Sequence, residues 1–458
     1  MENLNEAQIA DLFTEMKNVL IEKYHVYPMH LRKEIITLTR FRTKYFKSYV
    51  DLLNKFNENY NPRKKDEERY KCIKSFLEHI QEKPILTHIT NDDIEKFISI
   101  TNTSDFDKDQ KINDEMHEFT LLEACCFHGA VQCFKYCISE FKSEITDQCI
   151  NYSFLSGNTE IIHICHQGRT PNKEWMDYAI LSHKFDLITY LSDTFNMEID
   201  PKVCAKYHNL TAFNAFIDQS DDIERKLIYT AKFNLQRLFD FFLSRTKIEI
   251  KKDTSSMILF YATKNYNLRM ADKAISLGAD VNWVNKFNSI LSTAAARNAV
   301  KICELLIDHG ADINADVINK PLFVTSEYNS AQVCSILCKC GANVTEKGWN
   351  NGKTPLHVAA FYDSVDVCKI LLNHGVDVNI PDEIREPPLH DASRNNSINT
   401  TKFLLSRGAI PEAETIWGCS AFEVGSGEAS HIIYSKYNII QEKREKSKKQ
   451  FKRGKRRY

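Results

Sequence analysis

A short segment of the form Gly-Ala-Asp-x-Asn recurs through the second half of the chain. Copies begin at Gly278 and Gly310, altered copies begin at Gly341 and Gly375, and a shortened copy begins at Gly408. Successive copies therefore start about 33 residues apart. Such a period is typical of repeat proteins, in which each unit stacks on its neighbours instead of joining one central core. A stacked array also suits a length of 458 residues, which is too long for one ordinary core.

The unit that ends at Gly375 contains the signals of two helices. Thr354 can cap the first helix through its hydroxyl, and Pro355 suits the first helical position because no amide hydrogen bond is lost there. His357 can tie neighbouring repeats together by hydrogen bonding. Leu371 and its apolar neighbours have the spacing of a second helix, which Gly375 ends in a left-handed conformation. The low content of glycine and proline, 14 and 11 residues, also indicates a mostly helical chain.

The segment from Gly352 to Ala360, Gly-Lys-Thr-Pro-Leu-His-Val-Ala-Ala, resembles the ankyrin repeat. His390 follows His357 by one ankyrin period, about 33 residues. The resemblance covers residues 118–439. It implies an all-α solenoid of helix-turn-helix repeats with short hairpin loops, in roughly ten or eleven units.

The sequence predicts four segments. Residues 120–129 align with residues 354–363 without a gap, so the array is expected to extend far upstream of its clearest repeats. The expected segments are a helical N-terminal domain over 1–115, degenerate ankyrin-like repeats over 116–255, ankyrin repeats with a C-terminal cap over 256–440, and a basic tail over 441–458.

The N-terminal segment shows helical patterns but no repeat motif. Amphipathic helices are expected over residues 9–20, 31–56 and 70–80. An aromatic and lysine-rich stretch over 41–49, followed by degenerate repeats, is similar to the large ankyrin-repeat families of some unicellular protists. In those families such an N-terminal region has no assigned function, so this resemblance implies no activity.

The formal net charge of -1 conceals a basic C-terminal tail. Residues 441–458 contain ten Lys or Arg and two Glu, a net charge of +8, so the remainder of the chain sums to -9. The tail could be a nuclear import signal, a phosphate-binding arm for RNA or anionic lipid, or a solvated end that extends the last helix. Nucleic acid is therefore expected as a partner only through this tail.

The fourteen cysteines lie in a long chain whose start, MENLNEAQIADLF, has no apolar signal-peptide core. This pattern favours a reduced, intracellular protein, cytoplasmic or else nuclear. No stretch of 18 or more apolar residues exists, so no membrane span is expected.

The sequence contains no catalytic or metal-binding motif. Two cysteine and histidine groups, His163, Cys165 and His166, and Cys334, Cys338 and Cys340, lack the paired spacing of a structural zinc site. No nucleophile elbow, phosphate loop, zinc-protease helix or kinase signature is present. No enzyme, cofactor, metal or small-molecule substrate is therefore expected.

The ankyrin resemblance implies protein partners that meet the hairpin tips and the exposed face of the first helices. The positions carried over are Trp283, Lys286, Arg297, Tyr328, Trp349, Lys353, Phe361, Tyr362, Arg394 and Asn395. Aromatic and arginine side chains at such positions commonly contribute most of the binding energy. The alternative is that Trp349 and Phe361 only cover the seams between repeats. The expected function is a non-enzymatic scaffold or adaptor; the alternative is a nuclear or nucleic-acid-associated regulatory factor directed by the tail.

Overall fold

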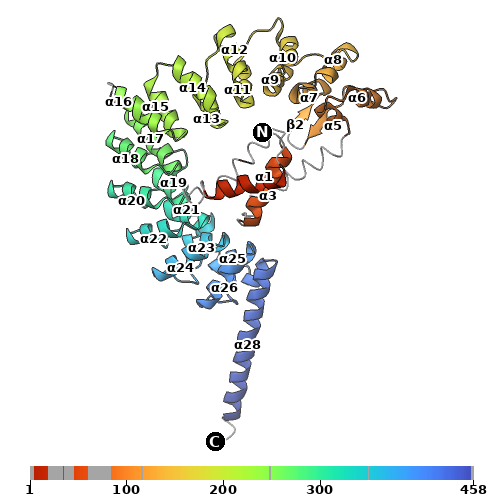
Figure 1. The fold of residues 1–458 in the computed structure, drawn as a ribbon. Coiled ribbons are helices and arrows are strands. Elements are labelled where there is room, and N and C mark those ends of the chain that lie inside the picture. The colour runs from red at the N-terminus through yellow and green to blue at the C-terminus, as the bar shows by residue number, and fades with distance from the viewer. Residues whose placement is uncertain are drawn as a thin grey trace. The chain divides into compact units, whose positions relative to one another are not determined.

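The computed structural model describes residues 5–18, 35, 46–59, 84–114, 117–246, 249–348 and 350–454. These residues are mostly helical (Figure 1). Two short antiparallel ladders pair β1 (Ile112–Asp114) with β2 (His117–Phe119), and β3 (Val284–Asn285) with β4 (Asn288–Ser289). The predicted all-α fold is thereby confirmed. The chain forms two compact units, unit 1 over Met1–Tyr229 and unit 2 over Thr230–Tyr458.

Unit 1 contains a series of helix hairpins. Their helices are α5 (Pro84–Thr90), α6 (Ile94–Thr101), α7 (Leu121–His128), α8 (Val131–Ser139), α9 (Asp147–Ser156), α10 (Thr159–His166), α11 (Lys173–Ser182), α12 (Phe185–Phe195), α13 (Pro201–Lys206) and α14 (Leu210–Gln219). The first helices contact one another in the order α5, α7, α9, α11, α13. The second helices also contact their counterparts, as α6 with α8 and α12 with α14.

Unit 2 repeats this two-row arrangement. Its helices, beginning with α15, which spans the unit boundary, are α15 (Ile223–Lys232), α16 (Gln236–Arg245), α17 (Lys252–Lys264), α18 (Leu268–Ser276), α19 (Ile290–Ala296), α20 (Val300–Asp308), α21 (Pro321–Tyr328), α22 (Ala331–Lys339), α23 (Pro355–Phe361), α24 (Val365–Asn373), α25 (Pro388–Arg394), α26 (Ile398–Ser406), α27 (Ala421–Val424) and α28 (Glu428–Gly454). First helices from α17 to α27 contact in succession, as do second helices from α18 to α28.

The turn between the two helices of each hairpin holds a residue in the left-handed conformation. These residues are Asp92, Gly129, Gly157, His183 and His208 in unit 1, and Asn234, Tyr266, Asn298, Asn329, Asp363 and Asn396 in unit 2. Several of their side chains also cap the second helix of the next hairpin. Asp363 Oδ1 accepts a hydrogen bond from the backbone N–H of Thr400 at 2.7 Å, and Asn396 Oδ1 accepts one from Ala429 at 2.9 Å. The same residue therefore forms the turn of one hairpin and caps the second helix of the next hairpin.

The array of hairpins begins at α5. Asp92 in the α5–α6 turn accepts hydrogen bonds from the backbone N–H groups of Gln132 and Cys133 at the start of α8, at 3.0 and 3.1 Å. In addition, α5 contacts α7 and α6 contacts α8. Residues 84–101 thus pack as a repeat, although the sequence analysis assigns them to the N-terminal domain. They lack the Thr-Pro-Leu-His pattern by which a repeat is recognised.

The described part of the N-terminal segment contains two helices that pack together, α1 (Glu6–Met16) and α3 (Phe46–Asn59). Asn5 caps α1, and the ring of Phe13 meets the ring of Phe56 edge-on with 5.0 Å between centroids. The helix expected over 9–20 corresponds to α1, and α3 overlaps the one expected over 31–56. The third expected helix, over 70–80, lies outside the described residues.

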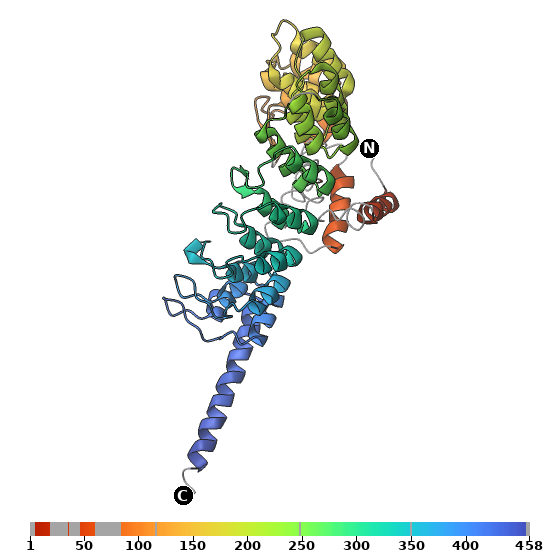
Figure 2. The ribbon, with the colours of Figure 1, turned by 90° about the vertical axis from the view of Figure 1, so that its left-hand side faces the viewer.

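The connections between successive hairpins are short from α8 to α17 and long from α18 to α27, while the connection from α6 to α7, residues 102–120, contains β1 and β2. The connection from α8 to α9 occupies only residues 140–146, and those from α10 to α15 are shorter still. The connection from α24 to α25 occupies residues 374–387, and the others between α18 and α27 have a similar length. These long connections, called fingers below, project from one side of the helices of unit 2 (Figure 2).

Asparagine side chains link successive fingers. Asn379 Nδ2 donates to the carbonyl of Gly408 at 3.3 Å, and its Oδ1 accepts from the N–H of Ile410 at 2.9 Å. Asn282 and Asn314 make equivalent pairs of bonds. Each of these three fingers is therefore tied to the one that follows it.

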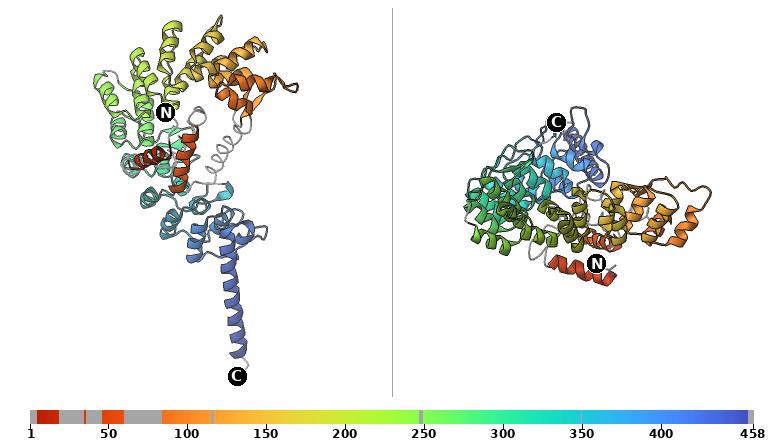
Figure 3. Two further views of the ribbon diagram at one scale, coloured as in Figure 1. Left: turned by 45° about the vertical axis from the view of Figure 1, so that its right-hand side comes forward. Right: turned by 90° about the horizontal axis from the view of Figure 1, so that it is seen from above.

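Helix α28 begins against the last repeat and then continues away from it (Figure 3). Ala429 and Ile433 are fully buried, whereas residues 442–447 are exposed. Residues 441–454, the larger part of the basic tail, continue this helix. Within the described residues, no helix has both the length and the apolar character needed to cross a membrane.

Candidate functional site

A shallow pocket opens between the hairpins α23–α24 and α25–α26 of unit 2. Its volume is about 420 Å³. A finger, the end of α23 and α25 provide its lining, which consists of Asn350, Asn351, Lys353, Phe361, Tyr362, Asp391 and Arg394. Four of these, Lys353, Phe361, Tyr362 and Arg394, are among the expected protein-binding residues. The tertiary structure therefore gathers four of the ten expected positions at one place.

The finger at the edge of this pocket has a fixed backbone. Asn351 and Gly352, within a short 3-10 turn over Asn350–Gly352, both adopt positive φ angles, 58° and 67°. The carbonyl of Asn351 accepts a hydrogen bond from the N–H of Glu383, in the next finger, at 3.0 Å. A Cβ on Gly352 would lie 2.8 Å from the side chain of Glu383. A larger residue here would have to push the Glu383 side chain aside and adopt a φ angle that favours glycine.

Lys353 does not lie on the surface, contrary to the sequence-based prediction. Its side chain is only 8% exposed. The ammonium nitrogen contacts Asp391 Oδ1 and lies 3.4 Å from Glu386 Oε2 and 3.8 Å from Asp382 Oδ2. Burying a charge costs free energy unless partners of opposite charge compensate it, and here three buried carboxylates compensate the lysine. Lys353 therefore supports the floor of the pocket and is not a surface contact.

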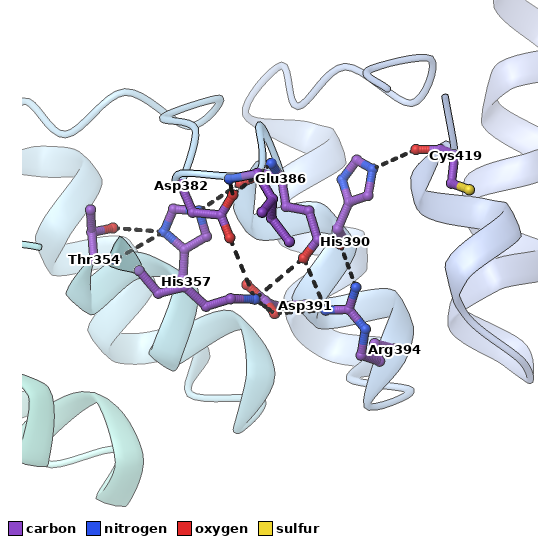
Figure 4. A network of polar contacts seen from close by, with 10 residues as sticks. Thr354, His357, Asp382, Glu386, His390, Asp391, Arg394 and Cys419 are labelled. Carbon is purple, nitrogen blue, oxygen red and sulfur yellow. Dashed lines mark hydrogen bonds and ion pairs between the residues drawn. The ribbon is translucent and has the colours of Figure 1, made fainter. Parts of the chain in front are cut away.

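Arg394 joins this buried network to the pocket mouth. Its guanidinium forms a two-pronged pair with Glu386, with nitrogen to oxygen distances of 2.5 and 3.1 Å, and also lies 3.2 Å from Asp391 Oδ1 (Figure 4). The arginine side chain remains 39% exposed while Glu386 and Asp391 are buried. The planar fork of an arginine suits this geometry better than a lysine ammonium would. The exposed side of Arg394 is thereby held in a single orientation.

The network contains three carboxylates and two cations. Burial raises the pKa of Asp391 to about 6, despite the nearby cations Lys353 and Arg394. Burial also raises the pKa of Asp382. For Glu386, burial is the largest influence and acts in the same direction, but the hydrogen bonds from Arg394 and the attraction of Arg394 and Lys353 together outweigh it, so the pKa is lowered. Arg394 and Lys353 therefore keep Glu386 ionised.

The two motif histidines link neighbouring repeats, as the sequence predicts. His357 Nδ1 accepts hydrogen bonds from the N–H and hydroxyl of Thr354, at 3.2 and 2.9 Å, so Nε2 carries the proton and donates to the carbonyl of Glu386 at 2.9 Å. Burial lowers the pKa of His357 to about 4. His390 lies 3.2 Å from the carbonyl of Cys419 in the equivalent contact. Both histidines are therefore structural contacts between repeats.

Of the six remaining expected positions, one follows Arg394 on the pocket side, four lie away from the pocket lining, and one lies outside the described residues. Asn395 donates through Nδ2 to the carbonyl of Phe361 at 2.7 Å, so it holds two hairpins together. Trp283 is half-buried, with its ring 5.7 Å from that of Phe260, and the Arg297 guanidinium lies 5.7 Å from the Tyr266 ring. Lys286 is exposed at a finger tip, and Tyr328 is half-buried at the end of α21. Trp349 lies outside the described residues.

Sequence reasoning missed Asp391 and Asp382. Asp391 occupies the position that Val358 holds in the preceding repeat, and it is 1% exposed. A charged residue at a position that is apolar in the neighbouring repeat indicates a buried ion pair, and Lys353 stands at the same repeat position as Glu386. Comparing the two repeats position by position would therefore have identified the network.

The finger tips carry exposed apolar side chains that the sequence analysis did not select. Phe287, Ile318, Ile416 and Trp417 are 53%, 73%, 52% and 68% exposed. Backbone hydrogen bonds connect successive tips, as between the N–H of Asn319 and the carbonyl of Phe287 at 3.1 Å. The N–H of Ile416 likewise donates to the carbonyl of Ile384 at 3.1 Å, so these tips are tied in neighbouring pairs.

No metal site was found among the described residues. Within that part of the chain, no group of three or more His, Cys, Asp or Glu side chains is arranged to hold an ion. The thirteen described cysteines are free, and ten of them are buried. For example, burial raises the pKa of the Cys303 and Cys204 thiols to about 12. Such thiols behave as small core residues.

Two family models match parts of the chain. A model described as "Ankyrin repeats (3 copies)" matches residues 227–317 and 322–415. A model described as "Domain of unknown function (DUF3447)" matches residues 141–217, which lie within the hairpins of unit 1.

Two fowlpox virus (strain NVSL) proteins and one human domain are similar to parts of the chain. The ankyrin repeat protein FPV031 is 30% identical over 169 residues, which are 33% of this chain and 50% of that protein. The ankyrin repeat protein FPV014 is 40% identical over 57 residues, 12% of this chain and 13% of that protein. The chain thus spans half or less of these relatives. The crystal structure of the human ASB11 ankyrin repeat domain, 20% identical, covers 46% of this chain and 96% of its own, with a TM-score of 0.42.

Proposed function

Residues 227–317 and 322–415 match a model of ankyrin repeats, and from this premise we propose that the protein is a non-enzymatic scaffold or adaptor. It binds a protein partner at the pocket between α23–α24 and α25–α26 and at the adjacent finger tips. Ankyrin repeats generally mediate interactions between proteins, and each added repeat extends the surface without changing the topology. Family membership gives only this general role, so the location of the surface is argued from the residues.

The observation that carries the proposal is the composition of the pocket. Phe361 and Tyr362 are half-buried, with 5.1 Å between their ring centroids, and line the pocket together with Arg394 of α25. Aromatic rings and an arginine in a recess are the side chains that most often dominate binding energy. Because Arg394 is already fixed by Glu386 and Asp391, little side-chain freedom is lost when a partner binds.

The hydrogen bonds of His357 support a non-enzymatic role. Hydrogen bonds occupy both ring nitrogens of His357, and its lowered pKa keeps the ring neutral near pH 7. A catalytic base needs a ring nitrogen within reach of a substrate proton.

The test is capture of partners from native cells by tagged full-length protein. The double variant Phe361→Ala/Tyr362→Ala removes both aromatic rings, and we expect its best partner to bind at least about tenfold more weakly. The matched control is Lys369→Ala, on the exposed side of α24, where the lysine pairs only with Asp366 at 2.9 Å. Equal loss in the control, or equal binding in all three proteins, would place the binding surface elsewhere. Thermal unfolding of each variant checks that the repeats still fold.

A further inference from the structure

Helix α28 (Glu428–Gly454) has little packing over residues 442–447. Its first turns bury Ala429 and Ile433, and Tyr437 packs with 5.3 Å between its ring centroid and that of Phe422. Beyond Ile440, residues 442–447 are all exposed, although Arg444 pairs with Glu412 at 2.6 Å. The helix nevertheless continues to Gly454. At 1.5 Å per residue, residues 441–454 extend about 20 Å.

The sequence of this segment places basic positions all around a helix axis. Between Lys443 and Arg453 there are seven Lys or Arg and one Glu. Successive helical residues are about 100° apart, so positions 443, 444, 446, 448, 449, 452 and 453 leave no side of the helix without a basic position. Like charges also stand four residues apart, as at 444 and 448 or 448 and 452, which destabilises a free helix. A ligand that supplies negative charge around the helix would relieve this repulsion.

We propose that residues 441–454 of α28 bind duplex DNA by lying in its major groove and contacting phosphates on both sides. The major groove of B-form DNA is about 12 Å wide and admits an α-helix. Phosphates line both edges of that groove, which matches a helix with basic positions on opposite sides. Contacts to phosphates supply affinity without requiring a particular base sequence.

Two other polyanions fit the helix less well. A helix that lies on a membrane surface needs an apolar face, and beyond Ile440 the described part of α28 has Phe451 as its one apolar residue. Proteins that bind single strands stack bases on several aromatic rings, and residues 441–458 contain only Phe451 and Tyr458. The remainder of the chain has a net charge of -9 and repels phosphates, which directs DNA to the helix end.

The experiment measures binding of full-length protein to a fluorescent 20-base-pair DNA duplex by anisotropy, between 50 and 200 mM KCl. If about five phosphates are contacted, log K should fall with log salt concentration with a slope of roughly -4 to -5. The test variant changes Lys448, Lys449, Lys452 and Arg453 to Gln, and should bind at least about thirtyfold more weakly. The control changes Lys252, Lys301, Lys369 and Lys402 to Gln; these lysines are 67%, 76%, 52% and 59% exposed, and their loss alters net charge equally.

Three results would overturn the proposal. The first is equal weakening by the control variant, which would mean that overall charge and not the helix is responsible. The second is tighter binding to a single-stranded RNA of the same length, or to vesicles of equal parts phosphatidylcholine and phosphatidylserine, than to the duplex. The third is the absence of binding to the duplex at 50 mM KCl, which would leave the import-signal or solvated-end interpretations of the tail. Circular dichroism of each variant shows whether the repeats remain folded.

Discussion

The hairpins of unit 1 and unit 2 have the same helical plan but different connections. From Gly129 on, the left-handed turn residues of unit 1 stand at 129, 157, 183 and 208, whereas those of unit 2 stand at 298, 329, 363 and 396, so each of these intervals is longer in unit 2. The extra residues form the fingers, which carry the linking asparagines, the apolar tips and one edge of the pocket. Stacking of helices alone is therefore enough to build the array, while the fingers add a surface.

Unit 1 uses other contacts to join its hairpins. Asn209 Nδ2 donates to the carbonyl of Ile180 at 2.8 Å, and the Lys184 ammonium donates to the carbonyl of Ser156 at 2.9 Å. The Thr146 hydroxyl donates to the Glu123 carboxylate at 2.9 Å. Glu123 stands at the repeat position that His357 occupies in unit 2. These bonds are made by turn and helix-end residues, so they need no finger.

The largest effect is expected from Leu371→Asp, because Leu371 is fully buried between the helices of unit 2. Burying an uncompensated charge should lower the free energy of unfolding by about 4 kcal/mol or more. Hydrogen exchange should show unit 2 opened while unit 1 stays protected. Lys369→Asp, exposed on the same helix, serves as the control. Loss of protection in both units together would contradict the division into two units.

Lys353→Met should destabilise unit 2 by about 3 to 5 kcal/mol, because it leaves Asp382, Glu386 and Asp391 buried without their central cation. Denaturant unfolding gives the free energy directly. Lys369→Met breaks only an exposed pair and should cost less than about 0.5 kcal/mol. A similar small cost for Lys353→Met would show that its ammonium is solvated.

Asp391→Asn should change how stability depends on pH. The pKa of Asp391 is about 6 in the folded state against an ordinary value of 3.8, so the folded state binds the extra proton and stability falls as pH rises from about 4 to 6. His357, with its pKa lowered from 6.5 to about 4, acts in the opposite direction, because the unfolded state binds the extra proton. The variant loses only the first contribution. Its free energy of unfolding should therefore rise more steeply between pH 4 and 6.5 than that of the wild type, and parallel curves would contradict the assignment.

Asn379→Ala removes both bonds from its finger to the next one and should cost about 1 to 2 kcal/mol. Faster hydrogen exchange is expected at residues 408–410 and not in the short connections of unit 1. Unchanged exchange there would show that the fingers are held without these side-chain bonds.

The smallest effect is expected for Trp417→Ser. Trp417 is 68% exposed at a finger tip, so unfolding should change by less than about 0.5 kcal/mol. A large loss of stability would mean that the tip is packed and is not a free surface for a partner.

Most of the unit 2 repeats could be predicted from sequence. The helix-ending glycines, the Thr-Pro-Leu-His start and the regular ankyrin period are local signals, because each reflects the backbone conformation or capping of one hairpin. The hydrogen bond from His357 to the next repeat was predicted in the same way and is confirmed. The similarity to protist families and the four domain boundaries stay predictions.

The first hairpin and the pocket depended on tertiary contacts. Nothing local distinguishes Asp92 as a cap for α8, a helix far along the chain, and the α5–α6 pair is recognised as a repeat only through that contact. The sequence predicts Lys353 at the surface because the residue stands near a finger. Its burial depends on three carboxylates, Asp382, Glu386 and Asp391, that come from other parts of the chain. The sequence by itself determined the period and the helices, since these follow from short-range backbone preferences. Only the tertiary structure decided which charged residues are buried, since burial depends on what neighbouring repeats bring to the same place.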